Sequence, residues 1–113
     1  MSKIVVYIAG PYRAASTWKI ECNIAQAKAA ALAVWQTERA VAYCPHANTA
    51  HFDGEAPDQV WLDGNLEILS RCDAVLLVGM WQESAGTLRE VKLADEMSIP
   101  VFHTLDSLLE WLT

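Results

Sequence analysis

The sequence predicts an α/β protein, a three-layer Rossmann- or flavodoxin-like sandwich with a parallel sheet of four to five strands. Short apolar runs of strand length alternate along the chain with longer amphipathic runs of helix length, in the order βαβαβαβα. The strand-like runs are apolar at consecutive positions, which is typical of parallel strands buried on both faces. Right-handed crossovers would then place helices on both faces of the sheet.

The first half of the chain supplies two strands and a long helix. Residues 4–8 read Ile-Val-Val-Tyr-Ile and are closed by Gly10-Pro11, which predicts a buried first strand. The alanine-rich run over 16–36 repeats its apolar residues at helical spacing for about five turns. Residues 41–43 are predicted as a short second strand, and 44–57 as a polar loop.

The second half supplies two further strand–helix units. Asp58 and Ser84 are of the residue types that cap helix N-termini, and each precedes a run with helical periodicity. The predicted elements are a helix from Asp58 to near Cys72, a strand at 73–78, a loop at 79–83, a helix from Ser84 to about Met97, a strand at 100–102 and a helix at 106–112.

Size and charge limit the possible functions. The 113 residues are fewer than an average domain of about 150, so residues 1–113 are predicted to form a single domain. Eight Lys and Arg against 14 Asp and Glu leave a net charge of −6, which disfavours polymeric nucleic acid and anionic membranes as partners. A small anion remains a candidate ligand, because a few backbone N–H groups and one arginine can hold a phosphate.

Cysteine usage and hydropathy indicate a location. Cys22, Cys44 and Cys72 are odd in number and form no CxxC pair, which is typical of buried thiols in a reducing compartment. The apolar run at the N-terminus is too short for a signal peptide, and no run approaches the about 20 residues of a membrane span. We therefore expect a cytoplasmic protein.

Three loops are candidates for the functional site. In open α/β sheets, ligands bind beyond the carboxyl ends of the strands, where the strand order reverses. This rule selects residues 9–13, 45–51 and 80–86. The dinucleotide, P-loop and GxSxG motifs are absent from the sequence, which argues against redox, nucleotide-hydrolysing and acyl-hydrolase activities, and no cofactor is predicted.

Two histidines and an aspartate raise the question of a metal site. His46 and His51 are five residues apart, with Asp53 close behind them. Such a group could bind a metal, but loop imidazoles that make local hydrogen bonds or touch a ligand are the preferred interpretation. No metal is predicted.

Two polar side chains are predicted to share helix faces with apolar residues. Glu90 precedes Leu93, Ala94 and Met97 at helical spacing, and Asn65 likewise falls on an apolar face. Taken singly, each has an ordinary explanation, because most glutamates on amphipathic helices are solvated and most buried asparagines are structural amides. A wider pattern is needed to assign them a function.

Three segments supply that pattern. They read Tyr7-Ile8-Ala9-Gly10-Pro11-Tyr12-Arg13, then Gly64-Asn65-Leu66-Glu67-Ile68-Leu69 leading into Cys72-Asp73-Ala74-Val75, then Ser84-Ala85-Gly86-Thr87-Leu88-Arg89-Glu90. Together they resemble the nucleoside 2-deoxyribosyltransferase superfamily, and most closely its small members, which include the deoxynucleoside 5′-monophosphate N-hydrolases. Each motif is moderately specific, and the order and spacing match from residue 4 to about 103.

The resemblance implies a covalent mechanism. Glu90 matches the family nucleophile, which attacks the anomeric carbon of a nucleoside, expels the base and forms a glycosyl ester. Water then gives hydrolysis and a second base gives transfer, in the manner of retaining glycosidases. Desolvation beside Leu93 and Met97 would raise the pKa of Glu90, whereas the N-terminal half of its helix would lower it.

The resemblance also implies binding residues. Gly10 would allow close approach of a ligand, Arg13 would contact a phosphate, and Ser84 with the amides near Gly86 would add anion contacts. The ordinary alternatives are a solvated arginine and a plain helix cap. The other residues expected to bind substrate are Tyr7, Pro11, Asn23, His46, Asn48, His51 and Asp53.

One position departs from the family pattern. Where the family usually has an aspartate that assists the leaving base, this chain has Asn65, which is expected to orient the substrate. An amide cannot deliver a proton at neutral pH, and loss of a positioned acid typically costs ~10²–10⁴ in rate. Asp53 is the one replacement that the sequence offers. The activity is therefore expected to be weak, altered or absent.

Three functions remain open. The first is a nucleoside or nucleotide N-glycosidase or deoxyribosyltransferase-like enzyme, and the second is a nucleotide-binding module that kept the pocket and lost the reaction. The third, an assembly protein with an interface marked by exposed tryptophans, ranks last because tryptophans are more often in the core. The expected partner is a small nucleoside or nucleotide, and the resemblance implies a homo-oligomer.

Overall fold

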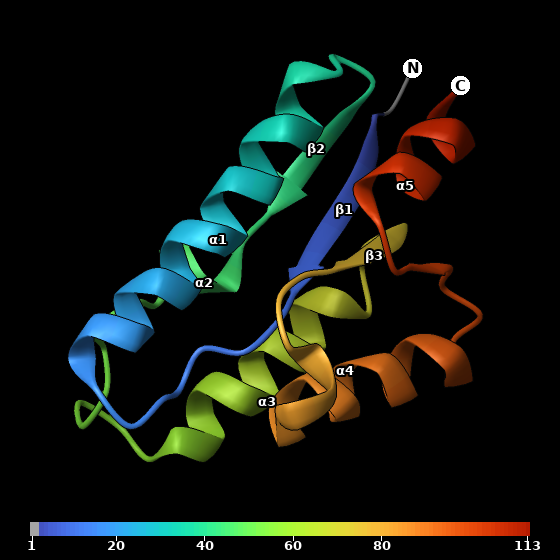
Figure 1. The fold of residues 1–113 in the computed structure, drawn as a ribbon. Helices are drawn as coiled ribbons and strands as arrows, with labels where there is room; N and C mark the ends of the chain where they lie inside the picture. The colour runs from blue at the N-terminus through green and yellow to red at the C-terminus, as the bar shows by residue number, and fades with distance from the viewer. Residues whose placement is uncertain (1–2) are drawn as a thin grey trace.

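A four-stranded parallel sheet forms the centre of the protein (Figure 1). The computed structural model describes residues 3–113. The strands lie in the order β2-β1-β3-β4, so the connection from β2 to β3 crosses over β1. Their bounds are β1 (Ile4–Ala9), β2 (Ala40–Tyr43), β3 (Ala74–Leu77) and β4 (Val101–Phe102). The predicted fold class is confirmed, and the order reverses between β1 and β3, where ligands bind in such sheets.

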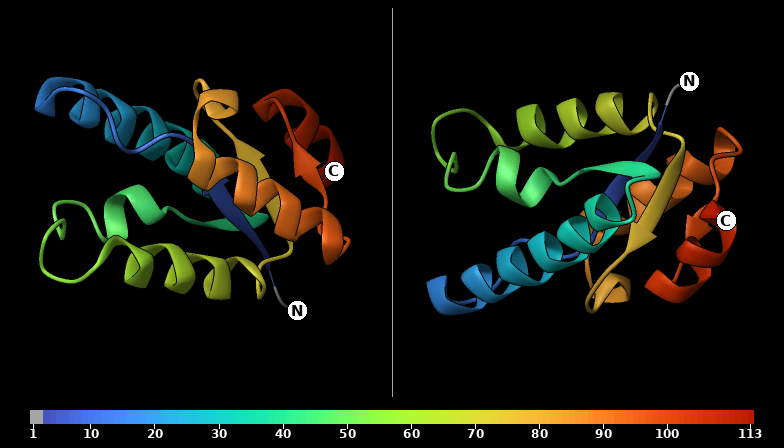
Figure 2. Two further views of the ribbon diagram at one scale, coloured as in Figure 1. Left: turned by 90° about the horizontal axis from the view of Figure 1, so that it is seen from below. Right: turned by 90° about the horizontal axis from the view of Figure 1, so that it is seen from above.

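Helices cover both faces of the sheet, which makes three layers (Figure 2). The helices are α1 (Thr17–Gln36), α2 (Pro45–Asn48), α3 (Asp58–Leu69), α4 (Ala85–Glu96) and α5 (Leu105–Leu112), with a 3₁₀ turn η1 (Trp81–Glu83). One core contains Val6 and Ile8 of β1 with side chains of α1 and α5. The other contains Tyr7 of β1 with side chains of α3 and α4.

Strand β1 determines which residues reach the site. It pairs in parallel with β2 on one side and β3 on the other, so it is the strand next to the reversal of order. Alternation along the strand sends Val6 and Ile8 to the core under α1, and Tyr7 to the opposite core. All three side chains are fully buried. Tyr7 is therefore placed between α3 and α4, below the end of the sheet where the loops gather.

The connection from β2 to α3 differs from the expectation. The sequence predicts a loop over residues 44–57, but Pro45–Asn48 form the short helix α2. Pro45 is at the helix start, where its missing N–H group costs no hydrogen bond. A single turn is too short to give a periodic apolar pattern, so the sequence carries no signal for it.

The two predicted caps have different outcomes. Ser84 caps α4, because its Oγ accepts a hydrogen bond from the Thr87 N–H at 3.2 Å. Asp58 does not cap α3, since Pro57 holds the cap position without a side-chain hydrogen bond and Asp58 is already helical. Its carboxylate pairs instead with Arg13. The helix ends at Leu69, short of the predicted end near Cys72.

Several tryptophans lie at the surface, contrary to the expectation that they belong to the core. Trp18 and Trp35, both on α1, are 74% and 53% exposed, and Trp111 on α5 is 44% exposed. Leu32 lies between the two α1 tryptophans in sequence and is also exposed.

In the part of the chain that the structure describes, no helix has the length and apolar character needed to cross a membrane.

Candidate active site

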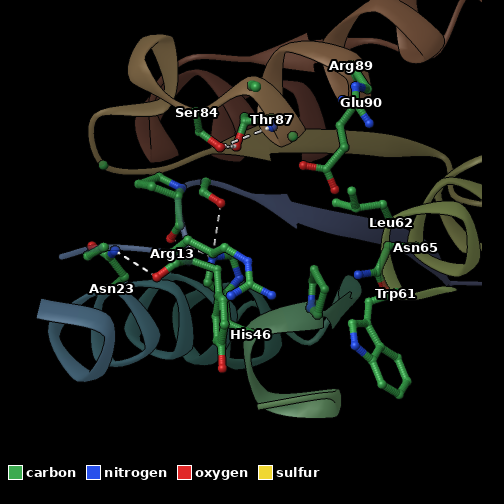
Figure 3. Close-up of a pocket in the computed structure, with 18 of the residues that line it drawn as sticks. Arg13, Asn23, His46, Trp61, Leu62, Asn65, Ser84, Thr87, Arg89 and Glu90 are labelled. Atoms are coloured by element: carbon green, nitrogen blue, oxygen red, sulfur yellow. Dashed lines mark hydrogen bonds between the residues drawn. The ribbon is translucent and has the colours of Figure 1, made fainter. Parts of the chain in front are cut away.

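A cavity of about 1060 Å³ opens at the carboxyl ends of the strands (Figure 3). Its walls come from the loops after β1 and β3, the N-terminal half of α1, the start of α2, one side of α3 and the first turns of α4. The lining includes these residues singled out from the sequence: Gly10, Pro11, Arg13, Asn23, His46, Asp53, Asn65, Ser84, Gly86 and Glu90. Three others, Tyr7, Asn48 and His51, lie outside the lining.

Glu90 lies at the floor of the cavity, and Tyr7 lies directly behind it. Tyr7 is fully buried in β1, and its hydroxyl donates a hydrogen bond to Oε2 of Glu90 on α4. Burial raises the pKa of Glu90 to about 7. The Tyr7 hydrogen bond lowers this pKa because it favours the charged form, but its effect is smaller than that of burial. Burial, followed by the negative charge of Glu90, raises the pKa of Tyr7, so the phenol keeps its proton. Tyr7 thus acts behind Glu90 and does not line the cavity.

Asn65 is held from behind by a second tyrosine. Tyr43 accepts a hydrogen bond from Nδ2 of Asn48 at 2.8 Å, and its own hydroxyl donates to Oδ1 of Asn65 at 3.3 Å. Because its oxygen is engaged there, the Asn65 amide presents its NH₂ group toward the cavity (Figure 3). Asn48, expected from the sequence to touch substrate, acts instead through Tyr43. The Tyr43 ring also packs 5.7 Å from the ring of Tyr7.

The mouth of the cavity carries an exposed ion-pair cluster. Arg13 contacts Oδ2 of Asp53 at 3.0 Å through Nη1 and Oδ1 of Asp58 at 2.6 Å through Nη2. The other oxygen of Asp53 accepts a hydrogen bond from the Tyr12 hydroxyl at 3.0 Å. Two carboxylates therefore surround one guanidinium.

His46 holds the loop that follows β1. The ring is 4% exposed, and its Nε2 lies 3.1 Å from the Gly10 carbonyl oxygen and 3.0 Å from that of Pro11. Two carbonyl acceptors place the proton on Nε2, and burial lowers the pKa of the imidazole, which keeps it neutral. From the other side, Asn23 donates to the Tyr12 carbonyl at 3.1 Å. Both residues therefore fix the loop backbone as well as lining the cavity.

Gly10 allows the loop to lie against the sheet. A Cβ atom at this position would be 2.5 Å from Cγ2 and 2.7 Å from the carbonyl oxygen of Val78. Contacts this short do not occur between real side chains and backbone, so only glycine fits. Its absent side chain brings the loop close to β3 and opens the cavity at the end of the sheet.

The predicted histidine group does not converge on one point. His51 forms a 2.8 Å contact with Glu21, whereas Asp53 binds Arg13 and Tyr12, and His46 binds loop carbonyls. Among residues 3–113, no group of three or more His, Cys, Asp or Glu side chains is placed to hold a metal ion.

Ser84 is engaged inside its own helix turn. In addition to the cap, its Oγ lies 3.0 Å from the Thr87 hydroxyl, which donates to it (Figure 3). Ser84 and Gly86 still line the cavity, so the cap and a ligand contact are compatible at this position.

Other lining residues were not assigned to the site from the sequence. The indole of Trp61 lines the cavity one helical turn before Asn65 and packs edge-on against Phe52 at 5.6 Å. Its i, i+4 spacing to Asn65 was the available signal. Tyr12 lies inside a motif already quoted, and Lys19 and Arg89 add cations to the lining.

Comparisons with known proteins supply a family and a fold relative. The model of a family described as "Domain of unknown function (DUF7768)" matches residues 4–104. No curated protein sequence matches the chain. Among solved structures, the fold is similar to a 2-deoxyribosyltransferase from the psychrotolerant bacterium Bacillus psychrosaccharolyticus, with a TM-score of 0.61 and 15% identity over 86% of this chain and 69% of that chain. At this identity the likeness shows the fold alone.

Proposed function

The chain belongs to the DUF7768 family, a domain family of unknown function, and we propose that it cleaves the N-glycosidic bond of a nucleoside, a deoxynucleoside or its 5′-monophosphate. The observation that carries the proposal is the Glu90 carboxylate, which faces the cavity from α4 and is held by the buried Tyr7 hydroxyl. The fold relative, described as a 2-deoxyribosyltransferase, supports the same reaction class.

The two carboxylate oxygens of Glu90 have different tasks. Oε2 accepts the Tyr7 hydrogen bond, which leaves Oε1 to attack C1′ of the sugar. The O–C1′ bond forms as the C1′–N bond breaks, and the electron pair of that bond leaves on the base nitrogen, which takes up a proton. Attack of water at C1′ then releases the sugar with a new hydroxyl and regenerates the carboxylate. A second base in place of water completes a transfer.

The pKa of Glu90 suits this task near neutral pH. Only the ionised carboxylate is a nucleophile, and a pKa of about 7 leaves about half of the protein in that form at neutral pH. The cleavage rate should therefore rise with pH through about 7 and level off above it.

Asn65 acts as a hydrogen-bond donor in this scheme. Its NH₂ group can bind a lone pair on the sugar or the base, but it supplies no proton to the leaving nitrogen. Asp53, the replacement acid considered from the sequence, already accepts hydrogen bonds from Arg13 and Tyr12. The departing base therefore takes its proton from water, and the reaction is slow compared with an acid-assisted one.

The test is release of free base from a panel of nucleosides, deoxynucleosides and their 5′-monophosphates. Glu90→Gln keeps an acceptor for Tyr7 and removes the nucleophile, so turnover should fall by about 10³ or more. Glu96→Gln, at the exposed end of the same helix, is the matched control and should keep the wild-type rate. Equal base release by wild type and Glu90→Gln would remove the enzymatic proposal.

The covalent step has its own measurement. Wild type quenched with acid during turnover should gain the mass of one sugar residue, and Glu90→Gln should gain none. Turnover without such an adduct in a Glu90-dependent reaction would favour direct attack by water.

A second candidate is a nucleotide-binding module without catalysis, and the observation that favours it is the amide at position 65. Thermal shift separates the two. A ligand at about 100 times its dissociation constant should stabilise the fold by roughly 2.7 kcal/mol whether or not it reacts. A shift without base release supports the binding module, and no shift with any member of the panel contradicts both candidates.

A further inference from the structure

The charges at the mouth point to a narrower substrate class: we propose that the cavity selects unphosphorylated nucleosides over their 5′-monophosphates. The proposal rests on the function proposed above and assigns substrate selection to the Arg13, Asp53 and Asp58 cluster. It runs against the phosphate contact that the family resemblance implies for Arg13.

Arg13 already has carboxylate partners at both terminal nitrogens. Nη1 contacts Asp53 at 3.0 Å and Nη2 contacts Asp58 at 2.6 Å. An arginine that binds a phosphate in the bidentate manner uses its N–H groups in the same planar fork. These contacts engage two of the five guanidinium N–H groups, and a phosphate bound to the remaining ones would lie beside both carboxylates.

Asp53 is fixed by more than its ion pair. Its second oxygen accepts a hydrogen bond from Tyr12, and the Tyr12 oxygen in turn accepts one from the backbone N–H of His51 at 3.0 Å. A phosphate bound at Arg13 would therefore lie next to a carboxylate that is held in place. The arrangement thus raises the electrostatic cost of binding a dianion.

The charged side chains of the cavity do not compensate for those carboxylates. Its basic lining residues are Arg13, Lys19 and Arg89, and its acidic ones are Asp53, Asp58, Glu83 and Glu90. The protein as a whole carries −6, which adds a further repulsion at long range. A phosphate dianion therefore enters a site that is not positively charged.

A nucleoside can form favourable hydrogen bonds with the carboxylates at the mouth. Its 5′-hydroxyl can donate a hydrogen bond to a carboxylate oxygen, whereas a phosphate dianion offers only acceptors. A dianion several ångströms from an exposed carboxylate in water is disfavoured by about tenfold in affinity, and salt screens this effect. The mouth can in this way favour the neutral ligand.

The test measures binding apart from turnover. Calorimetry on Glu90→Gln gives dissociation constants for a deoxynucleoside and its 5′-monophosphate at low and high salt. The nucleoside should bind about tenfold more tightly at low salt, with a smaller difference at high salt. Adding Asp58→Asn should reduce that preference several-fold, as should Asp53→Asn, which keeps an acceptor for Tyr12.

Asp63→Asn is the matched control. Asp63 is exposed on α3 like Asp58 and carries the same charge, but it contacts Gln59 and does not line the cavity. The selectivity of this variant should equal that of its Glu90→Gln parent. Equal or tighter binding of the monophosphate, or the same selectivity in the Asp58 and Asp63 variants, would overturn the inference.

The outcomes separate this inference from the proposed function. Base release by wild type together with monophosphate-selective binding keeps the function and removes the inference. Nucleoside-selective binding without base release from any substrate keeps the inference and removes the reaction. Failure of both ligands to bind contradicts both proposals.

Discussion

The floor and the mouth of the cavity are held in place by different forces. At the floor, Glu90 contacts a fully buried tyrosine, and burial raises the pKa of the carboxyl to about 7. At the mouth, the side chains of Arg13, Asp53 and Asp58 are 56%, 38% and 58% exposed. Exposed ion pairs contribute about 0–1 kcal/mol each to stability, whereas changes in a packed core typically cost several times more. Substitutions at the floor should therefore affect the stability of the fold, whereas substitutions at the mouth can change its charge with little effect on stability.

The largest expected effect comes from adding a side chain where the loop after β1 packs against Val78. Gly10→Ala would place its Cβ against the Val78 backbone, so strand β3 or the loop must shift. We expect the free energy of unfolding to fall by about 3 kcal/mol, as measured by urea denaturation.

Gly64 provides the matched control for that change. It lies inside α3, and an added Cβ there would meet no atom within 4 Å. Gly64→Ala should therefore stabilise the protein by about 0.5–1 kcal/mol, because alanine is the better helix former. A small effect at Gly10 as well would contradict the close packing of this loop against Val78.

The next effect is on the pH dependence of stability. The folded-state pKa of Glu90 is raised from 4.5 to about 7, so the folded protein binds this proton more tightly than the unfolded chain does. Its contribution to stability is complete below pH 4.5 and is lost as the pH rises to about 7. Glu90→Gln mimics the protonated form, so it should be about 2 kcal/mol more stable than wild type above pH 7 and equal to it below pH 4.5. The free energies of unfolding of both proteins are measured by denaturation at several pH values. A difference between them that does not change with pH would contradict the raised pKa of Glu90.

A smaller effect, on the rate, should come from Tyr7→Phe. Phenylalanine keeps the packing and removes the hydrogen bond that favours the ionised form of Glu90. The pH at which cleavage reaches half its maximum should therefore move above about 7, and the rate at neutral pH should fall by about tenfold to a hundredfold.

Tyr12→Phe is the counterpart at the mouth. It removes a hydroxyl that binds Asp53 and leaves the floor intact. The pH profile of cleavage should stay at the wild-type position in this variant. A shift of the same size in both variants would show that the two regions are coupled.

The smallest effect is expected at Arg13. Arg13→Gln removes two exposed ion pairs, so the free energy of unfolding should fall by no more than about 1 kcal/mol. The comparison is again urea denaturation, at low and high salt. A loss above about 2 kcal/mol would mean that the mouth has a structural role that its exposure does not suggest.

The elements that the sequence predicts well are those with local signals. Strands β1 and β3 are buried on both faces, so they read as unbroken apolar runs, and α1 and α4 carry helical periodicity over several turns. The single turn α2 carries no such signal. Asp58 resembles a cap, but its carboxylate binds an arginine 45 residues away, a contact that only the folded chain creates.

The candidate site follows the same rule. The helix face of Glu90 could be predicted from its neighbours, because that depends on spacing within one helix. Its hydrogen bond to Tyr7 spans 83 residues and depends on how β1 and α4 pack. Asn48 and His51 both fall in the expected loop. Asn48 lies on the short helix α2 and contacts Tyr43, whereas His51 lies in the turn beyond it and contacts Glu21. Loop membership alone does not tell which way a side chain points.

The pairing of Tyr7 with Glu90 also limits how this protein can diverge. The phenol has no access to solvent, so an apolar side chain at position 90 would leave it without its acceptor, at a cost of about 1–3 kcal/mol. The stability of the fold alone therefore favours a hydrogen-bond acceptor at position 90, whatever the reaction. Glutamine keeps an acceptor for the phenol, so it is the substitution at position 90 that the fold should tolerate best.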